Sequence, residues 1–299
     1  MQAQQTICTR NINGEITGHC DLWWRNTPPD PNHHIGLIGR FHADDSDSAQ
    51  RLLENAGNRL KAEGCTLALG PMDGDSWHSY RATTRAGTRP AFVMEPSVDD
   101  TLAGYFTAAG FNLHSRYISA EMDLDGARIS NRYRLLSWFL GKRLRLRNLD
   151  IEDYDAEMER IHRFCCRAFA DNHLYTPIDA REFCALYEPL RAHINPELVF
   201  IVEKDGQILG LLFAIPDLNQ LQRGEAIDTL IFKTLAVAPE MRGRGIAFLL
   251  MYRGLRAARA AGYRRIIHAL MYRDNRSRGF SDNNQVDVIR EYGLFSREL

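Results

Sequence analysis

Apolar and polar positions follow their clearest pattern between residues 229 and 262. Residues 230–237 are mostly apolar or β-branched, which predicts a largely buried strand that ends before Pro239. Small and apolar residues then recur at helical spacing as far as Gly262, a residue type that commonly stops a helix. The expected buried face of this helix is made of Ala247, Leu250, Met251, Gly254, Leu255, Ala258 and Ala261. The pattern therefore predicts a strand, a tight turn and a long helix.

The turn between this strand and this helix is suited to an anion. It consists of Arg242, Gly243, Arg244, Gly245, Ile246 and Ala247. Backbone N–H groups in the first turn of a helix lack intrahelical partners, and the helix dipole adds partial positive charge there. Glycines have no Cβ, so a phosphate can approach the backbone closely, and the two arginines add charge. We therefore expect a phosphate or pyrophosphate at this turn.

Two common phosphate-binding motifs do not fit the turn. No Gly-Lys-Ser/Thr follows the glycines, and no acidic ribose partner appears about 20 residues later, where a dinucleotide fingerprint has one. The stretch resembles the acetyl-CoA motif of the GCN5-related N-acetyltransferase (GNAT) superfamily, Gln/Arg-x-x-Gly-x-Gly/Ala. Arg242, Gly245 and Ala247 match it, after a strand that ends Leu-Ala-Val-Ala-Pro-Glu. The alternative interpretation is a solvated glycine turn before an ordinary surface helix.

The resemblance implies a cofactor site. In such a site the backbone of Leu235, Ala236 and Val237 would pair with the pantetheine arm of acetyl-CoA, and the N–H groups of residues 242–247 would hold the pyrophosphate. Asn275 matches an asparagine that many family members carry after the next strand, and we include Ser277 in the expected cofactor site. Acetyl-CoA is thus the expected co-substrate, and no metal is expected.

An earlier part of the chain repeats the order strand, turn, helix, glycine, strand. The order occurs at residues 35–69 and again at residues 231–270, with similar spacing. The first turn has no glycine and carries Asp44, Asp45 and Asp47, which suit a helix N-terminus but repel a phosphate. We expect a degenerate copy that does not bind CoA. An unrelated α/β domain is the alternative.

These patterns predict an α/β (α+β) chain of two GNAT-like domains. Each domain is expected to be a mixed, mostly antiparallel twisted sheet flanked by helices. The predicted divisions are a degenerate domain at residues 1–126, a basic linker at 127–143 and an acetyltransferase domain at 144–299. The irregular stretch at residues 70–96 is interpreted as a surface loop, with the acceptor groove as the alternative location.

Composition narrows the possible partners. The chain has 299 residues, which suits two domains, and a net charge of −1, which gives no case for nucleic-acid or membrane binding. Its six cysteines form no Cys-x-x-Cys pair, which is typical of reduced thiols in a cytoplasmic protein. The spacing of His162, Cys165, Cys166 and His173 is not that of a usual zinc site. We expect a monomer or homodimer.

The chemistry of acetyl transfer indicates which side chains could act as the general acid. Acetyl transfer needs a donor for the developing oxyanion and benefits from an acid that protonates the departing thiolate. The resemblance implies direct attack in a ternary complex, with no acyl-enzyme. Where the family usually has a tyrosine acid, this chain has Asp282. Tyr272 and Tyr292 are the candidate replacements, and Ser277 is a further one.

The base has one main candidate. Asp228 lies at the start of the central strand, where family members often carry an acidic base, although a turn residue is the plainer interpretation. His268 titrates in the right range, and water is the remaining alternative.

The predicted function is an acyl-CoA-dependent N-acyltransferase that moves an acetyl group to a primary amine. The acceptor is expected to be a small amine, an amino acid or a peptide, bound between the two domains. The alternative is a non-catalytic CoA-binding or sensing protein, in which the changed region after Asn275 has lost the chemistry. A different phosphate ligand in the glycine turn is a third possibility.

Overall fold

The protein is described here by a computed structural model. It describes residues 1–126, 139–140, 143–273 and 286–299. Within these residues no helix combines the length and the apolar character needed to cross a membrane.

The N-terminal half is a small sheet with a helix packed on it. β3 and β4 run parallel and are joined by α1, and β1 and β2 add antiparallel strands. Asp45 caps α1, because its Oδ1 accepts the Ser48 N–H at 2.7 Å. The elements are β1 (Gln5–Arg10), β2 (Ile16–Trp23), β3 (Ile35–Ala43), α1 (Ser46–Ala62), β4 (Leu67–Gly70), β5 (Ala82–Arg85), α2 (Thr101–Ala108) and β6 (Asn112–Asp123).

The C-terminal half contains the predicted strand, turn, helix and following strand, as β10, α7 and β11. Here β7, β8, β9 and β10 pair antiparallel and β10 pairs parallel with β11. The elements are β7 (Arg145–Asn148), α4 (Tyr154–Phe169), α5 (Ala180–Tyr187), η1 (Glu188–His193), η2 (Pro196–Leu198), β8 (Val199–Lys204), β9 (Gln207–Pro216), α6 (Asn219–Gln222), β10 (Thr229–Val237), η3 (Pro239–Met241), α7 (Ile246–Ala260), β11 (Arg265–Tyr272) and β12 (Val286–Glu298).

Helix α7 lies close to the sheet at Gly254. A Cβ at that position would come within 2.4 Å of a Leu212 methyl and 2.9 Å of the Phe232 ring. Glycine therefore permits the close approach. The predicted apolar face of α7 is largely confirmed, since Leu250, Met251, Gly254, Leu255 and Ala258 are buried.

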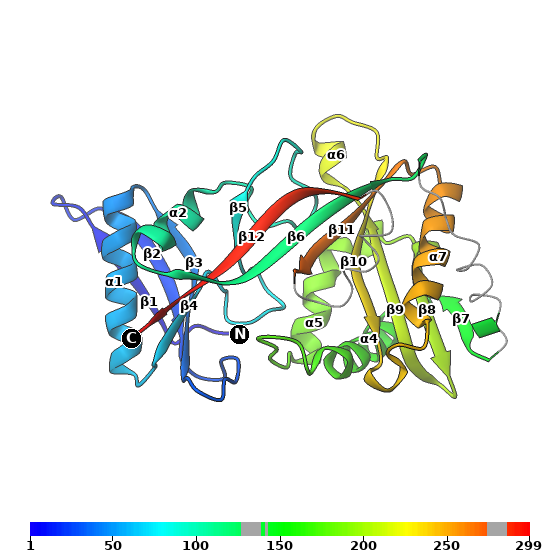
Figure 1. The fold of residues 1–299 in the computed structure, drawn as a ribbon, viewed down its shortest axis with the longest axis horizontal. Helices are drawn as coiled ribbons and strands as arrows, with labels where there is room; N and C mark the ends of the chain where they lie inside the picture. Colours follow the sequence, from blue (N-terminus) through cyan, green and yellow to red (C-terminus); the bar gives the residue numbers. More distant parts are fainter. Residues whose placement is uncertain (127–138, 141–142, 274–285) are drawn as a thin grey trace.

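The two halves share one continuous sheet of twelve strands, with the order β1-β2-β3-β4-β12-β6-β11-β10-β9-β8-β7 and β5 paired to β12. β6 and β12 run side by side across the middle of the molecule (Figure 1). One end of β6 pairs with β11, and the C-terminal end of β12 pairs with β4. The predicted mixed, mostly antiparallel sheet with flanking helices is confirmed. The last strand of the chain thus completes the sheet of the first half.

A buried ion pair fixes β12 to the loop that follows β5. Arg290 Nε donates to Glu95 Oε1 at 2.8 Å, and their side chains are 1% and 0% exposed. Arg290 also donates to the carbonyl oxygen of Arg89, and the Tyr292 hydroxyl donates to Glu95. Both charges are therefore compensated inside the protein, where an unpaired charge is very costly.

This pair gives a prediction for stability. Arg290→Met should lower the free energy of unfolding by about 3–5 kcal/mol, because it leaves the Glu95 carboxylate buried without its cation. Urea denaturation followed by circular dichroism measures the loss. The matched control is Arg85→Met, which removes a pair with Glu291 in which the arginine is 56% exposed. That change should cost less than about 1 kcal/mol, and equal losses for the two variants would contradict the prediction.

Candidate functional site

The glycine turn forms an open cradle before α7. Gly243 and Gly245 have φ values of 76° and 86°, in the left-handed region that favours glycine, and Gly245 is the N-cap of α7. Ile246 is fully buried and anchors the first turn. The backbone N–H groups at this end have no intrahelical partner by the geometry of a helix. The predicted strand, turn and helix are therefore present. Within the turn, the N–H groups of Arg242 and Arg244 already donate to the carbonyl oxygens of Pro239 and Met241, at 3.2 Å and 3.3 Å.

Arg242 has a structural task in this turn. Its Nη2 donates to the Ala168 carbonyl at 2.7 Å, and its Nη1 lies 3.3 Å from Asp171 Oδ2. These contacts hold the turn against the C-terminal end of α4. Arg244 is exposed. Both predicted arginines are thus exposed, and Arg242 is the one that these contacts hold in place.

The strand before the cradle separates from its neighbour. β10 pairs with β11 only from residues 229–232, while its pairing with β9 continues to Val237. β11 turns away at Leu270, which has a left-handed φ of 56° beside a bulge in its pairing with β6. Among the described residues, the β11-facing edge of Leu235, Ala236 and Val237 has no strand partner. Such an edge can pair with an extended ligand.

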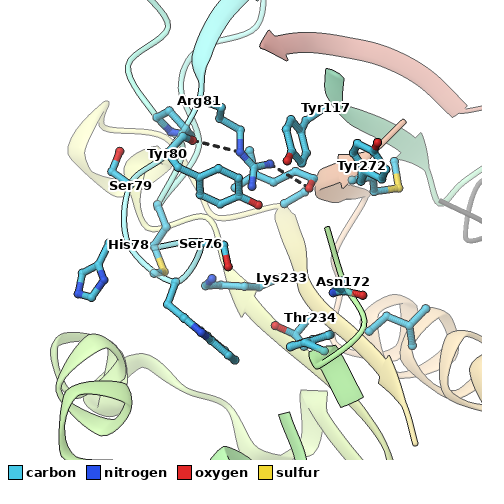
Figure 2. Close-up of a pocket in the computed structure, with 18 of the residues that line it drawn as sticks. Ser76, His78, Ser79, Tyr80, Arg81, Tyr117, Asn172, Lys233, Thr234 and Tyr272 are labelled. Atoms are coloured by element: carbon cyan, nitrogen blue, oxygen red, sulfur yellow. Dashed lines mark hydrogen bonds between the residues drawn. The ribbon is translucent and has the colours of Figure 1, made fainter. Parts of the chain in front are cut away.

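A cavity of about 860 Å³ lies where the strands separate (Figure 2). Its walls come from both halves of the chain and are rich in aromatic rings. The lining consists of Ser76, Trp77, His78, Ser79, Tyr80, Arg81, Met94, Glu95, Pro96, Tyr117, Phe169, Asp171, Asn172, His173, Tyr175, Leu186, Tyr187, Phe232, Lys233, Thr234, Leu235, Met251, His268, Ala269, Leu270, Met271 and Tyr272. The stretch at residues 70–96 thus forms a wall of the cavity.

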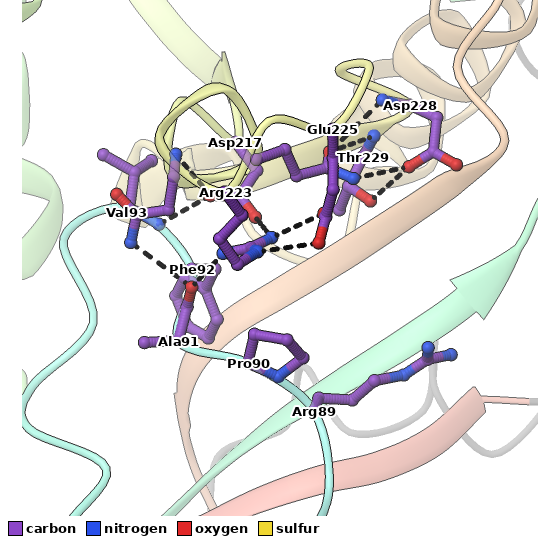
Figure 3. Close-up of polar contacts among 12 residues, drawn as sticks. Arg89, Pro90, Ala91, Phe92, Val93, Asp217, Arg223, Glu225, Asp228 and Thr229 are labelled. Atoms are coloured by element: carbon purple, nitrogen blue, oxygen red, sulfur yellow. Dashed lines mark hydrogen bonds and ion pairs between the residues drawn. The ribbon is translucent and has the colours of Figure 1, made fainter.

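That stretch is tied to the C-terminal half by polar contacts. The Val93 N–H donates to Asp217 Oδ1 at 2.8 Å, and Arg223 Nη1 donates to the Ala91 carbonyl at 3.0 Å (Figure 3). The Trp77 indole donates to the Thr176 carbonyl at 2.8 Å. The cavity wall supplied by the first half is therefore held in register with the second half.

Arg81 and Lys233 line the cavity; Arg81 belongs to the stretch for which the acceptor groove was the alternative location, and sequence reasoning missed Lys233. Arg81 is 5% exposed and lies against Tyr80 and Tyr117, with its Cζ 3.7 Å and 4.0 Å from the two ring centroids. Lys233 is the extra residue at a bulge of β10 and lies 5.6 Å from the Tyr187 ring centroid. Burial, together with the charge of Arg81, lowers the pKa of Lys233 to about 8. A lysine inside a run of buried strand residues was the available signal for it.

Two of the three cavity histidines, His173 and His268, have lowered pKa values, whereas that of His78 is raised by its bond to Asp75. Burial lowers the pKa of His268 to about 4, and its Nε2 has no hydrogen-bond partner within the described part of the chain. Burial also lowers the pKa of His173, whose Nε2 lies 2.9 Å from the Ser115 hydroxyl. His173 stacks on Tyr272 with ring centroids 5.7 Å apart. His268 and His173 therefore add no charge to the cavity at neutral pH.

The two candidate tyrosines lie in different surroundings. Tyr272 lines the cavity at the end of β11, beside Tyr117. Tyr292 is 1% exposed and lies outside the lining, with its hydroxyl bonded to Glu95 and 3.0 Å from the Ser119 hydroxyl. Burial and the charge of Glu95 raise the pKa of Tyr292. Its contacts are those of a structural side chain.

Asp228 lies at the opposite end of β10 from the cradle. Its Oδ1 accepts from Arg265 Nη2 at 2.5 Å and from Gln220 Nε2 at 2.8 Å, and it is outside the cavity lining. Burial alone would raise the pKa of Asp228, but hydrogen bonds from Gln220 and Thr229 and the charge of Arg265 lower it. The carboxylate is therefore ionised and engaged in holding its own loop.

The remaining predicted residues are Asn275 and Ser277, which lie outside the described residues together with Asp282.

Two groups bear on metal binding. Asp75, His78 and Glu182 bring one ligand atom each within 4.8 Å of one another. Asp75 already accepts hydrogen bonds from the backbone N–H groups of Trp77 and His78. Its side-chain hydrogen bond with the His78 ring raises the pKa of His78. Of the earlier zinc set, His162 lies 2.8 Å from the Ile178 carbonyl, whereas His173 faces Ser115. The zinc set therefore does not converge on one point.

The sequence match to a known protein family lies in the C-terminal half of the chain. The family model described as "Acetyltransferase (GNAT) family" matches residues 156–281. A curated relative, a bacterial ceramide synthase from Caulobacter vibrioides (strain NA1000 / CB15N), is 26% identical over 188 residues. That match covers 62% of this chain and 48% of the relative. The chain thus spans about half the length of this relative.

Solved structures match nearly the whole chain. A GCN5-related N-acetyltransferase from Sphaerobacter thermophilus has a TM-score of 0.54 at 12% identity, covering 99% of this chain and 81% of its own. A tandem GNAT protein from the clavulanic acid biosynthesis pathway has a TM-score of 0.51 at 12% identity, with coverage of 99% and 84%. A glucosamine N-acetyltransferase region of a fungal multi-domain protein has a TM-score of 0.57 at 12% identity, with coverage of 98% and 33%.

At 12% identity these structures establish the fold, and the family model identifies the part of the chain that contains the cradle. Residues 156–281 are thus similar in sequence to the acetyltransferase (GNAT) family, and the chain is similar in fold to solved GNAT structures.

Proposed function

We propose that the protein is an acyl-CoA-dependent N-acyltransferase that moves an acetyl group from acetyl-CoA to a primary amine. One observation carries the proposal. The amide cradle before α7 leads along the unpaired edge of β10 directly to the cavity at Lys233 and Thr234. A ligand with its phosphates at the cradle and an extended arm on that edge delivers its far end into the cavity.

The reaction needs few groups. The amine nitrogen attacks the thioester carbonyl, the new C–N bond forms, and the C–S bond breaks with release of a thiolate. The amine proton leaves to water, since Asp228 is engaged elsewhere. We assign Tyr272 the role of acid that donates a proton to the thiolate, because it lines the cavity, beside Tyr117 and His173.

The acceptor is proposed to enter between the two halves of the chain. Residues of the first half form one wall of the cavity, so the first half contributes to acceptor binding even though its acidic turn, Asp44 to Asp47, is unsuited to phosphate. The Caulobacter relative is named a ceramide synthase, but it matches this chain over less than half of its length. That relative supports amide formation as a reaction class and leaves the acceptor of this chain open.

The cofactor site is tested by Gly245→Glu. The new carboxylate would occupy the position of the pyrophosphate, so calorimetry should show the loss of acetyl-CoA binding. Gly262→Glu is the matched control, because Gly262 has the same φ of 86° at the other end of the α7 segment. The control should bind acetyl-CoA like the wild type, with one site per chain. Unchanged affinity in Gly245→Glu, or two sites in the wild type, would contradict the assignment.

The acid is tested by comparing two conservative variants. Tyr272→Phe should lower kcat for release of CoA by about 10²-fold, because the thiolate leaves without its proton donor. Tyr292→Phe should act mainly on the free energy of unfolding, with a loss of about 1–2 kcal/mol from the missing bond to Glu95. CoA release with an amine panel and urea denaturation measure the two effects. A larger fall in kcat for Tyr292→Phe would reverse the assignment.

The alternative function, a non-catalytic CoA-binding or sensing protein, predicts a different rate of CoA release. It retains acetyl-CoA binding at the cradle but releases no CoA above the buffer rate with any amine offered. Turnover by the wild-type protein therefore separates it from the enzyme.

A further inference from the structure

We propose that the amine acceptor also carries an anionic group, a carboxylate or a phosphate, and that Arg81 and Lys233 bind this group. The proposal rests on the function proposed above, since it concerns the acceptor of the same cavity. It is carried by the position of two cations in a cavity rich in aromatic rings, each without a carboxylate partner within the described residues.

Arg81 is oriented but not neutralised. Its Nε donates to the Tyr80 carbonyl at 3.1 Å and its Nη1 to the Leu270 carbonyl at 3.1 Å, and the two tyrosine rings hold its plane (Figure 2). In the part of the chain that the structure describes, neither a carboxylate nor a partner for Nη2 accompanies it. A guanidinium fixed by carbonyls and rings, with donors left over, is prepared for an oxyanion.

The backbone of Arg81 supports the same conclusion. Its φ is 80°, a left-handed conformation that is unfavourable for a residue with a long side chain. Strained residues of this kind concentrate at ligand sites, where the surrounding structure holds them. The strain here directs the side chain between Tyr80 and Tyr117, toward the cavity.

Lys233 reaches the same space from the other half. It comes from β10, and Figure 2 shows it below the space that Arg81 borders from above. The groups that face it are Arg81, the Cys165 thiol of α4 and the Tyr187 ring of α5. None of these is an anion at neutral pH, because burial raises the pKa of Cys165 and of Tyr187. The lysine therefore contributes a second uncompensated charge.

The carboxylates in the lining are already engaged. Glu95 is paired with Arg290 at 2.8 Å, and Asp171 lies 3.3 Å from Arg242 at the cradle, with its side chain 73% exposed. Neither Arg290 nor Arg242 lines the cavity. The cavity consequently keeps the positive charge of Arg81 and Lys233, and an anion from solution is the group that can balance it.

The phosphates of CoA are a less suitable partner for these cations. Along the chain, the order from the cradle inward is Gly245, Val237, Leu235 and then Lys233, so the two cations lie beyond the unpaired edge that would hold the extended arm. The acyl end of the cofactor arrives there, and the acceptor must meet it. The anion recognised at this point is therefore assigned to the acceptor.

Matched pairs of amines test the proposal with the full-length protein. L-phenylalanine is compared with L-phenylalaninol, and O-phosphoethanolamine with ethanolamine, by measuring CoA released from acetyl-CoA. The proposal expects the anionic member of at least one pair to have the higher kcat/KM, by about 10- to 100-fold, the usual strength of a charge-assisted contact. The pair that shows the difference identifies carboxylate or phosphate. Equal kcat/KM values within both pairs would overturn the proposal.

Variants assign the preference to the two side chains. Arg81→Gln and Lys233→Met should each reduce the ratio within the preferred pair by about tenfold or more, while the affinity for acetyl-CoA stays unchanged. Arg85→Gln, an exposed arginine four residues from Arg81 and outside the lining, should keep the wild-type ratio. If Arg81→Gln fails to fold, Lys233→Met decides alone. A wild-type ratio in the folded variants would overturn the assignment.

A binding measurement separates this proposal from the function on which it rests. Calorimetry with CoA-saturated protein compares N-acetyl-L-phenylalanine with N-acetyl-L-phenylalaninol, and N-acetyl-O-phosphoethanolamine with N-acetylethanolamine. Tighter binding of an anionic member, lost in Lys233→Met, supports the anion site even when no amine is turned over. Equal affinities within both pairs overturn it. Failure of the wild type to bind acetyl-CoA overturns the proposed function instead.

Discussion

The backbone pairing of β6 with β12 is the constraint on which the rest of the structure depends. β6 is the neighbour of both β11 and β12, so Tyr117 stands opposite Tyr272 on one side and Tyr292 on the other. Because β11 lies next to β10 and β12 lies beyond β6, Tyr272 lines the cavity, whereas Tyr292 is buried against Glu95. The ion pair between Arg290 and Glu95 then locks β12 to the loop that forms the opposite wall. A slip of one residue would turn each side chain to the other face.

The site lies where this otherwise continuous sheet opens. Two local irregularities create the opening, the bulge of β10 at Lys233 and the turn of β11 at Leu270. The first places a cation in the wall, and the second frees the edge of β10. Leu270 also accepts the hydrogen bond that orients Arg81. The same two departures from regular pairing therefore create the channel for an extended ligand and position the charged groups at its end.

Turns, helix faces and helix caps depend on residues close together in the chain, and these features were predictable from the sequence. The turn at Gly243 and Gly245 and the apolar face of α7 depend on neighbours within a few residues, as does the cap at Asp45. Pairing between distant strands was not predictable in this way, because β12 finds β4 across more than 200 residues and its pattern does not identify a partner. The domain divisions at residues 126 and 144 stay a prediction.

The candidate site also contains some parts that local sequence determines and others that only folding brings together. The cradle could be derived from one continuous stretch, but Arg81 and Lys233 become neighbours only through folding. Both Tyr272 and Tyr292 were candidate acids in the sequence, and what separates them is the order of the strands, which places β11 beside β10 at the cavity and β12 beyond β6. Asp228 was distinguished by its partners, Arg265 and Gln220, which sequence reasoning did not connect to it.

Folding leaves the positive charges of Arg81 and Lys233 in the cavity without an anionic partner among the described residues. Burying Glu95 is tolerated because Arg290 accompanies it, whereas Arg81 and Lys233 are taken from water with aromatic rings and carbonyls as their only described partners. Ring faces and dipoles recover part of the lost hydration, but they do not neutralise a charge. The lowered pKa of Lys233 reflects the remaining free-energy cost of burying its charge near Arg81. An acceptor that brings its own anion removes that penalty as it binds, so the charges that weaken the empty protein would strengthen the complex.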